Sequence, residues 1–198
     1  MPSAAGVVGP PTDVRMNPTV MKRKVCLVGE QGVGKTSLIR RFTQGAFSDE
    51  YVRTLGAVAT KKTVTVAGPA GAPVQVDLVI LDIMGDRSFM QLFRDAYFSG
   101  AAAVLAVFDL TAPATLKALP EWIRGVRRTV GAIPVVAIGN KADLEGRTAV
   151  SVPDVAKVLG PLELDPVLTS AKTGQNVEAA FLRLATHVEA AARPPDDA

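Results

Sequence analysis

Hydrophobic residues along this chain form two patterns, short continuous apolar runs and longer amphipathic stretches. The runs "KVCLVG", "AAAVLAVFDL" and "IPVVAIGN" are typical of strands covered on both faces. After the first run, "TSLIRRF" places Leu38, Ile39 and Phe42 on one helical face. The same periodicity predicts further helices over residues 89–98, 114–129, 153–159 and 177–192.

Two segments in the first half of the chain alternate apolar and polar residues, as half-buried strands do. They are "TKKTVTV" and "VQVDLVILD", and "AGPAGAP" between them predicts a hairpin with a glycine-proline turn. "VLTSA" is predicted as a last short strand before the final helix. Alternating strands and helices predict an α/β fold with a doubly wound, mostly parallel sheet, to which the hairpin adds one antiparallel edge strand.

The chain has 198 residues, 48% of them hydrophobic, which is enough for one globular domain with a real core. Residues 1–20 contain four prolines and two glycines without periodicity, so we expect a flexible N-terminal extension. The predicted domain therefore covers residues 21–192, and residues 193–198 form a short polar tail.

The charge balance argues against a nucleic-acid-binding protein. Lys and Arg exceed Asp and Glu by 22 to 19, and the dense basic stretches are limited to "KRK" at 22–24 and "RR" at 40–41. This is too little for a nucleic-acid groove, so we interpret both stretches as solvated surface.

Cysteine usage and the chain ends favour a cytoplasmic protein without a membrane anchor of its own. Cys26, the one cysteine, lies in an apolar run and has no intrachain partner, so it is predicted to be a buried small hydrophobe in a reducing compartment. No apolar stretch is long enough to span a membrane. Residue 2 is proline rather than the glycine needed for myristoylation, and the tail "ARPPDDA" has no cysteine to prenylate.

Residues 29–36, "GEQGVGKT", follow the first predicted strand and lead into the first predicted helix. Glycine, four residues, glycine, lysine and threonine in this setting form the phosphate-binding loop pattern. Gly32 and Gly34 let the backbone approach phosphates, Lys35 reaches the outer phosphates, and the Thr36 hydroxyl can ligate Mg²⁺. A plain glycine-rich turn is the alternative, which lysine followed by threonine disfavours.

Ligands of doubly wound sheets bind beyond the carboxyl ends of the strands, so the other predicted strand ends should also carry binding groups. In "LDIMG", Asp82 is placed to hold Mg²⁺ through water, and the Gly85 N–H can donate to a terminal phosphate. Taken alone, Asp followed by Gly is also ordinary turn chemistry.

Two further strand ends carry groups suited to a purine base. In "GNKAD", Asp143 can accept hydrogen bonds from the ring N–H and the amine of guanine, Asn140 braces the loop, and the Lys141 stem packs along the base. In "TSAK", the Ala171 N–H is placed to meet the guanine carbonyl. A polar strand-to-helix turn is the alternative interpretation of "GNKAD" by itself.

The order and spacing of "GEQGVGKT", "LDIMG", "NKAD" and "TSAK" resemble those of the Ras superfamily of small GTPases over residues 22–190. The second-switch segment "GDRSFMQLFRDAYFSGA" is most similar to the Rab branch. The resemblance implies a P-loop NTPase fold with six strands and five helices, bound GTP or GDP, and Mg²⁺. It also implies protein effectors and regulators that bind residues 47–56 and 85–98.

The resemblance also assigns roles to individual residues. Phe47 matches the aromatic residue that packs against the base, Tyr51 the one that covers the phosphates, and Thr54 the threonine that contacts Mg²⁺ and the terminal phosphate. The implied catalytic residues are Lys35, Thr54, Gly85 and Asp86, and the implied metal ligands are Thr36, Thr54 and, through water, Asp82. The implied nucleotide-binding residues are Gln31, Gly32, Val33, Gly34, Lys35, Thr36, Ser37, Phe47, Tyr51, Thr54, Gly85, Asn140, Lys141, Asp143, Leu144, Ser170, Ala171 and Lys172.

The sequence departs from the family pattern near the predicted terminal-phosphate site. Asp86 stands where most members have the glutamine that orients the attacking water. Ile83 and Met84 replace a smaller and more polar pair, and Gln31 stands where many members have glycine. The prenylated C-terminal cysteines of most Ras and Rab proteins are not found here.

Three functions fit these residues to different degrees. The leading hypothesis is a guanine-nucleotide switch that needs Mg²⁺ and hydrolyses GTP slowly, because ionised Asp86 can accept a hydrogen bond from water but cannot donate one to the phosphate. The alternative that Asp86 favours is a nucleotide-binding interaction module with little or no turnover. An ATP-using phosphotransferase is disfavoured by Asp143 and by the lack of an arginine-rich lid.

Four other residues receive simpler interpretations. His187 has no second histidine to pair with and is predicted to lie on the surface or partly buried in the last helix. Trp122 and Phe181 occupy apolar positions of helices and are expected in the core. Arg87 is interpreted as a switch arginine paired with a carboxylate, with a built-in arginine finger as the alternative.

Overall fold

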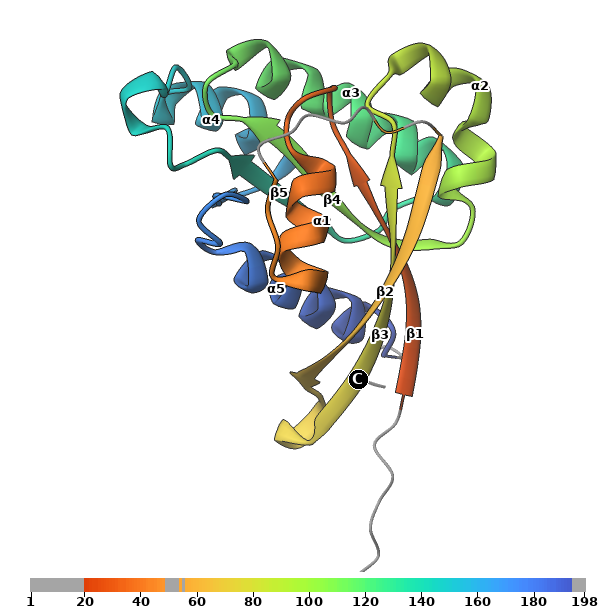
Figure 1. The fold of residues 1–198 in the computed structure, drawn as a ribbon. Helices are drawn as coiled ribbons and strands as arrows, with labels where there is room; N and C mark the ends of the chain where they lie inside the picture. The colour runs from red at the N-terminus through yellow and green to blue at the C-terminus, as the bar shows by residue number, and fades with distance from the viewer. Residues whose placement is uncertain (1–19, 49–53, 55, 194–198) are drawn as a thin grey trace, which may run out of the picture.

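The computed structural model describes residues 20–48, 54 and 56–193 and contains one six-stranded sheet in the order β2-β3-β1-β4-β5-β6 (Figure 1). β1 is parallel to both β3 and β4, and β4, β5 and β6 continue in the same direction. Only β2 is antiparallel, paired with β3 from Ala57↔Ile83 to Ala67↔Pro73. The strands are β1 (Val20–Val28), β2 (Ala57–Ala67), β3 (Pro73–Ile83), β4 (Ala101–Asp109), β5 (Val135–Asn140) and β6 (Val167–Leu168).

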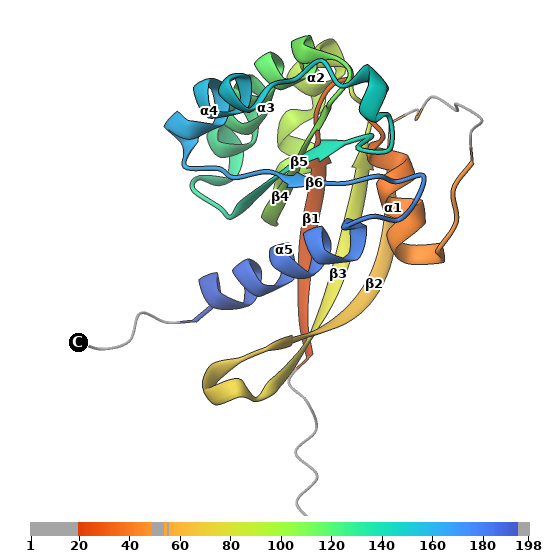
Figure 2. The same ribbon diagram turned by 90° about the vertical axis from the view of Figure 1, so that its left-hand side faces the viewer.

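Helices cover both faces of this sheet. The α-helices are α1 (Lys35–Gln44), α2 (Arg87–Phe98), α3 (Pro113–Val130), α4 (Val152–Leu159) and α5 (Val177–Ala191). Short 3₁₀ turns occur at Pro69–Gly71, Glu145–Arg147 and Gly160–Leu162. Figures 1 and 2 show α1 and α5 on one face and α2, α3 and α4 on the other, and the β2–β3 hairpin extends below the helices. None of the helices described is both long and apolar enough to cross a membrane.

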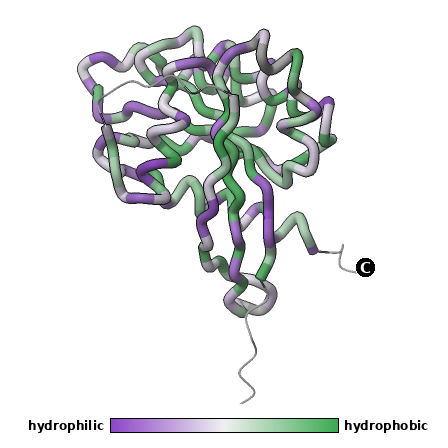
Figure 3. Tube along the Cα trace, turned by 45° about the vertical axis from the view of Figure 1, so that its right-hand side comes forward, coloured by the Kyte–Doolittle hydropathy of each residue, from purple (hydrophilic) through white to green (hydrophobic). Residues whose placement is uncertain are grey.

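The central strand β1 contributes to both cores because its side chains alternate between the two faces. Val25 and Leu27 pack with α1 and α5, whereas Cys26 and Val28 pack with α2, α3 and α4. All four are nearly inaccessible to solvent. The continuous apolar runs therefore reflect burial on two faces, and Figure 3 shows the hydrophobic residues concentrated along the central strands.

The core predictions for individual side chains are confirmed. Cys26 is fully buried, and burial raises the pKa of its thiol to about 12. Phe181 stacks on Phe42 with ring centroids 4.0 Å apart, and Trp122 is buried between α3 and the sheet. His187 is half-buried on α5, as expected.

The fold class is confirmed, and the differences lie at the ends of elements. β1 begins at Val20, so the last residue of the predicted extension starts the strand, which pairs with β3 from Val20↔Gln75 onward. β6 contains only Val167–Leu168 rather than all of "VLTSA". The Thr169 N–H still donates to Gly139 O of β5 at 2.8 Å, but the backbone then leaves the sheet, with the Ser170 N–H donating to Gln175 O at 3.1 Å.

Candidate nucleotide site

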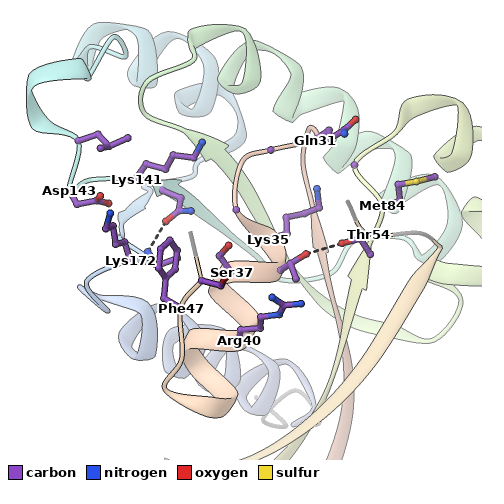
Figure 4. Close-up of a pocket in the computed structure, with 18 of the residues that line it drawn as sticks. Gln31, Lys35, Ser37, Arg40, Phe47, Thr54, Met84, Lys141, Asp143 and Lys172 are labelled. Atoms are coloured by element: carbon purple, nitrogen blue, oxygen red, sulfur yellow. Dashed lines mark hydrogen bonds between the residues drawn. The ribbon is translucent and has the colours of Figure 1, made fainter. Parts of the chain in front are cut away.

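The loops that follow β1, β3, β5 and β6 meet at the carboxyl end of the sheet and enclose a cleft of about 300 Å³. Figure 4 shows Phe47, Asp143 and Lys172 at one end of the cleft, with Lys35, Thr54 and Gln31 toward the other. The cleft is lined by Gln31, Gly32, Gly34, Lys35, Thr36, Ser37, Arg40, Phe47, Ser48, Thr54, Ile83, Met84, Gly85, Asn140, Lys141, Asp143, Leu144, Ala171 and Lys172.

Glycines are required in the loop of residues 29–36 by its backbone and its neighbours. Gly29 has φ +137°, and a Cβ there would lie 2.1 Å from Val107 O. Gly34 has φ +99°, and a Cβ there would lie 2.3 Å from Asn140 Nδ2. Other residues would be strained at both positions, so the loop conformation follows directly from the sequence.

Lys35, the first residue of α1, is held against the loop by backbone carbonyls. Its Nζ donates to Gly29 O at 2.8 Å and to Glu30 O at 3.0 Å, and the residue is 7% exposed. Burial lowers the pKa of the ammonium from 10.5 to about 8. Burial removes water from the ammonium group, which lines the cleft. A phosphate bound there would compensate for the lost hydration by stabilising the positive charge.

Three oxygen-bearing side chains converge beside Lys35. Thr36 Oγ1 donates to Asp82 Oδ2 at 2.5 Å and lies 2.9 Å from Thr54 Oγ1, which is 3.3 Å from the same carboxylate oxygen. Burial raises the pKa of Asp82, partly offset by the hydrogen bond from Thr36. Asp82 Oδ1 is the one buried side-chain oxygen or nitrogen that lacks a hydrogen-bond partner among the residues described.

These groups fit Mg²⁺. Hydroxyl and carboxylate oxygens are the hard ligands that Mg²⁺ accepts, and the ion commonly keeps water and uses substrate phosphates to complete its shell. A buried carboxylate oxygen without a partner is a suitable acceptor for metal-bound water. In the described part of the chain, no three His, Cys, Asp or Glu side chains gather as a metal site, so a magnesium site here depends on the threonine hydroxyls.

Gly85 closes the cleft on the β3 side. A Cβ on this residue would lie 2.5 Å from Lys35 Nζ and 2.6 Å from Gln31 N, so only glycine fits. The neighbouring Ile83 and Met84 line the cleft, but Asp86 does not. Asp86 Oδ1 accepts a hydrogen bond from the Ser88 N–H at 2.9 Å, the bond typical of a residue that caps a helix N-terminus.

Asn140, at the end of β5, connects three loops. Its Nδ2 donates to Val33 O at 2.9 Å, and its Oδ1 accepts from Thr169 Oγ1 and the Ala171 N–H, both at 3.2 Å. Asn140 is 2% exposed, so this amide is a buried and well-satisfied junction. The predicted bracing role of Asn140 agrees with these contacts.

The groups predicted to contact the base are fixed by their neighbours. Asp143 Oδ1 accepts from Ser170 Oγ at 2.6 Å, and Lys141 Nζ pairs with Asp109 Oδ2 at 2.6 Å. The Ala171 N–H, predicted to meet the guanine carbonyl, donates to Asn140 Oδ1. The carboxylate of Asp143 is thus oriented by a hydroxyl.

Most predicted site residues line the cleft, but among the described residues Val33, Asp82, Asp86 and Ser170 do not. Val33 points into the core and is 1% exposed, while its carbonyl accepts from Asn140. Ser170 is fully buried behind Asp143. Tyr51 and most of residues 47–56 lie outside the described residues, as does the side chain of Arg87.

The sequence interpretation missed several residues at the site. Arg40 and Ser48 line the cleft. Trp122 Nε1 donates to Glu30 Oε1 at 3.1 Å, which ties the core of α3 to the phosphate loop. The interpretation of "RR" as solvated surface is wrong for Arg41, whose guanidinium donates to three backbone carbonyls. Sequence proximity gave no signal for these contacts, since Glu30 and Trp122 are 92 residues apart.

Comparisons with known proteins agree with this geometry. A family model described as the Ras family matches residues 24–190. The Ras-related protein Rab-30 of Homo sapiens is 35% identical over 171 residues, which are 86% of this chain and 81% of the relative. Rab-13 of Canis lupus familiaris is 30% identical over 83% of this chain and 79% of its own length. Rab-4A of Rattus norvegicus is 32% identical over 83% and 73%, respectively.

Proposed function

The chain belongs to the Ras family of small GTPases and resembles its Rab branch, and from this premise we propose that it binds GTP and GDP with Mg²⁺ and hydrolyses GTP slowly. The observation that carries the proposal is one cleft lined by Lys35 and Thr36, from the start of α1, and by Asp143, from the loop after β5. As a small GTPase it is a nucleotide-controlled switch that acts through protein effectors and regulators, for which residues 47–56 and 85–98 are the proposed surface.

Guanine selectivity is proposed to rest on Asp143. An ionised carboxylate offers only acceptors, which match the ring N–H and exocyclic amine of guanine but not the edge of adenine. Ser170 donates to Oδ1 at 2.6 Å and fixes the carboxylate. A base that leaves buried polar groups unmatched can be rejected by about 10⁴-fold or more.

The triphosphate is proposed to lie along residues 31–37. Backbone N–H groups and the start of α1 supply positive potential there, and Lys35 reaches the outer phosphates. Thr36, Thr54 and, through water, Asp82 would hold Mg²⁺, which when bound neutralises phosphate charge. Gly85, whose backbone lies beside Lys35, is placed to donate its N–H to the terminal phosphate.

Hydrolysis transfers the terminal phosphoryl group of GTP to water and releases GDP, so the chain must orient that water. Lys35, Thr54 and Gly85 are the proposed catalytic contacts. Asp86 does not line the cleft and accepts from the Ser88 N–H, which supports a slow intrinsic reaction. The same observation favours a second candidate, a nucleotide-binding interaction module with hardly any turnover.

The domain boundaries, the location and the partners of the chain are also proposed. We propose that the residues before Val20, where β1 begins, are an extension to the domain, and that a polar tail follows at 193–198. The single buried Cys26 is compatible with a cytoplasmic location. The guanine nucleotide and proteins, rather than nucleic acid, are the proposed partners.

The base assignment is tested by competition titrations of GDP against ADP on wild type and Asp143→Ala. We expect a preference for GDP of about 10⁴-fold or more in wild type. Asp143→Ala should lose at least about 100-fold in GDP affinity, because two hydrogen bonds to a charged group disappear, while ADP affinity stays the same. Asp165→Ala, an exposed aspartate near α5, is the matched control. Comparable affinities of wild type for GDP and ADP would contradict the proposal.

A further inference from the structure

Arg41 lies in the last turn of α1, half-buried, and its guanidinium donates only to backbone carbonyls in the interactions that the structure describes for it. Nε donates to Ala171 O at 2.8 Å, Nη2 donates to Lys172 O, and Nη1 donates to Gly45 O at 3.0 Å. The first two acceptors lie about 130 positions away in the sequence, in the "TSAK" loop. One side chain therefore joins the helix of the phosphate loop to the loop beside the base.

Arg41 contacts the loop at the base end of the cleft from the side that faces away from the cleft. Ala171 and Lys172 line the cleft, but Arg41 does not. It lines a separate hollow between α1, β2 and α5, together with Phe42, Lys62 and Gly174. The Ala171 carbonyl consequently points away from the cleft, toward the guanidinium.

The hydrogen bond from Arg41 to Ala171 O also sets the direction of the Lys172 N–H. All peptide bonds in the described chain are trans, so the C=O of Ala171 and the N–H of Lys172 point in opposite directions. With the carbonyl held by Arg41, the Lys172 N–H is directed to the cleft side. The Ala171 N–H already donates to Asn140 Oδ1 at 3.2 Å, so Lys172 supplies the next donor along this loop.

The third contact fixes the end of α1 and the residues that follow it. Gly45 caps α1 with φ +66°, its N–H donates to Arg41 O at 3.0 Å, and its carbonyl accepts from Arg41 Nη1. Two residues later, Phe47 lines the same end of the cleft as Asp143 and Lys172 (Figure 4). Arg41 thus holds both the base loop and the segment that carries Phe47.

Arginine is suited to this role and lysine is not. A planar guanidinium offers five N–H donors in a fixed fork, whereas an ammonium is a compact point charge on a flexible stem. Three carbonyls in different directions match the fork. A cation in the last turn of α1 also interacts favourably with the helix dipole.

We propose that Arg41 is a positioning residue for base recognition, which aligns the Ala171–Lys172 peptide so that its N–H donates to the carbonyl oxygen of guanine. This inference rests on the proposed binding of guanine nucleotides. Asp143 accepts hydrogen bonds from the ring N–H and the amine, and the loop held by Arg41 donates one to the carbonyl oxygen. Because these contacts involve different atoms of the base, their contributions to affinity can be measured separately.

The test compares the dissociation constants of three diphosphates on wild type, Arg41→Ala and Arg41→Lys. GDP carries both groups, 6-thio-GDP replaces the carbonyl oxygen with sulfur, a weak acceptor, and IDP lacks only the amine. Wild type should bind GDP about tenfold more tightly than 6-thio-GDP, as expected for one hydrogen bond. In Arg41→Ala this ratio should fall to about 1–2, while the ratio of IDP to GDP stays at its wild-type value.

Arg41→Lys keeps the charge and the stem but reaches one carbonyl at most, so its 6-thio-GDP ratio should lie between the other two. It also carries the test if the alanine variant does not fold. Arg183→Ala is the matched control, because Arg183 is exposed on α5 and donates to a backbone carbonyl, Asp165 O, outside the cleft. Its two ratios should equal those of wild type.

Two results would overturn the inference while leaving the proposed function intact. Equal loss of affinity for all three nucleotides in Arg41→Ala would show that Arg41 only stabilises the fold. Wild-type binding of 6-thio-GDP as tight as GDP would show that the loop does not read the carbonyl. A wild type that binds ADP as well as GDP would instead overturn the proposed function and this inference with it.

Discussion

Asp86 is the residue at which this chain departs most from the small-GTPase pattern. It stands immediately after Gly85, where most members have glutamine, and its carboxylate accepts from the Ser88 N–H at 2.9 Å. Glutamine can accept from the attacking water and donate toward the phosphate, whereas ionised Asp86 can only accept. A carboxylate near phosphate oxygens would also repel them, so capping α2 is a more favourable use of this side chain.

The contribution of Asp86 to the hydrolysis rate is measured by single-turnover GTP hydrolysis of wild type, Asp86→Gln and Asp86→Ala. We expect wild type at or below about 10⁻⁴ per second. Asp86→Gln should be about tenfold or more faster, because glutamine restores the bridging hydrogen bonds. Asp86→Ala should hydrolyse GTP at the wild-type rate.

Asp86→Ala should also lose stability, by about 1 kcal/mol, because α2 loses its N-terminal acceptor. Ser151→Ala is the control, since it removes a similar cap from α4, far from the phosphate end, and should leave hydrolysis unchanged. A brisk wild-type rate that both Asp86 substitutions abolish would mean that the carboxylate works as a base, and would refute this account.

At the scale of elements, two segments bear on the terminal phosphate. Gly85 precedes α2 and lies against the phosphate loop, and Thr54 contacts Thr36 and Asp82 just before β2. Both segments are proposed to contact the third phosphate, and Thr54 also Mg²⁺. This full set of contacts exists only in the triphosphate state. The loop at residues 29–36 has no such dependence, because its glycines and Asn140 fix its backbone.

Hydrogen exchange with GDP and with a non-hydrolysable GTP analogue should therefore differ in a segment-specific way. Peptides covering residues 47–56 and 85–98 should exchange at least about tenfold more slowly with the analogue, since new contacts lower the population of open states. Peptides from α5, which packs in the core beneath α1, serve as the internal reference and should not change. Identical traces throughout would favour the interaction module over the switch.

At the scale of the whole molecule, nucleotide binding and folding are linked because the cleft uses loops from four strands. A ligand that binds only the folded chain, at a thousandfold excess over its dissociation constant, stabilises it by about 4 kcal/mol. For a domain of this size that corresponds to a rise in Tm of about 8–16 °C. Asp82 Oδ1, which is buried without a hydrogen-bond partner among the residues described, is one site where the bound group would relieve an existing cost.

Thermal unfolding should accordingly show the largest Tm with GDP and Mg²⁺, a smaller value with GDP and EDTA, and the lowest without nucleotide. Thr36→Ala should lose most of the difference between Mg²⁺ and EDTA, because it removes a proposed ligand. Thr186→Ala, an exposed threonine on α5, should keep the wild-type difference. A wild-type Tm that is the same with Mg²⁺ and with EDTA would contradict a magnesium-dependent site.

Local sequence determined the elements and the phosphate loop of this protein. Alternating runs specified strands and helices because burial on one or two faces dictates a period, and "GEQGVGKT" specified its loop because Gly29 and Gly34 tolerate backbone positions and contacts that other residues do not. The strand-end positions of Asp82, Asn140 and Asp143 were predictable for the same reason, since parallel strands deliver their carboxyl ends to one edge.

Only the tertiary structure decided which long side chains reach across the molecule. Arg41 appeared in the sequence as half of a basic pair, yet its guanidinium holds a loop about 130 residues away. Trp122 appeared as a core residue, yet its indole also donates to Glu30. Arginine and tryptophan combine a large apolar body with a polar end, so periodicity predicts where the body is buried, whereas the partner of the polar end depends on how distant elements pack.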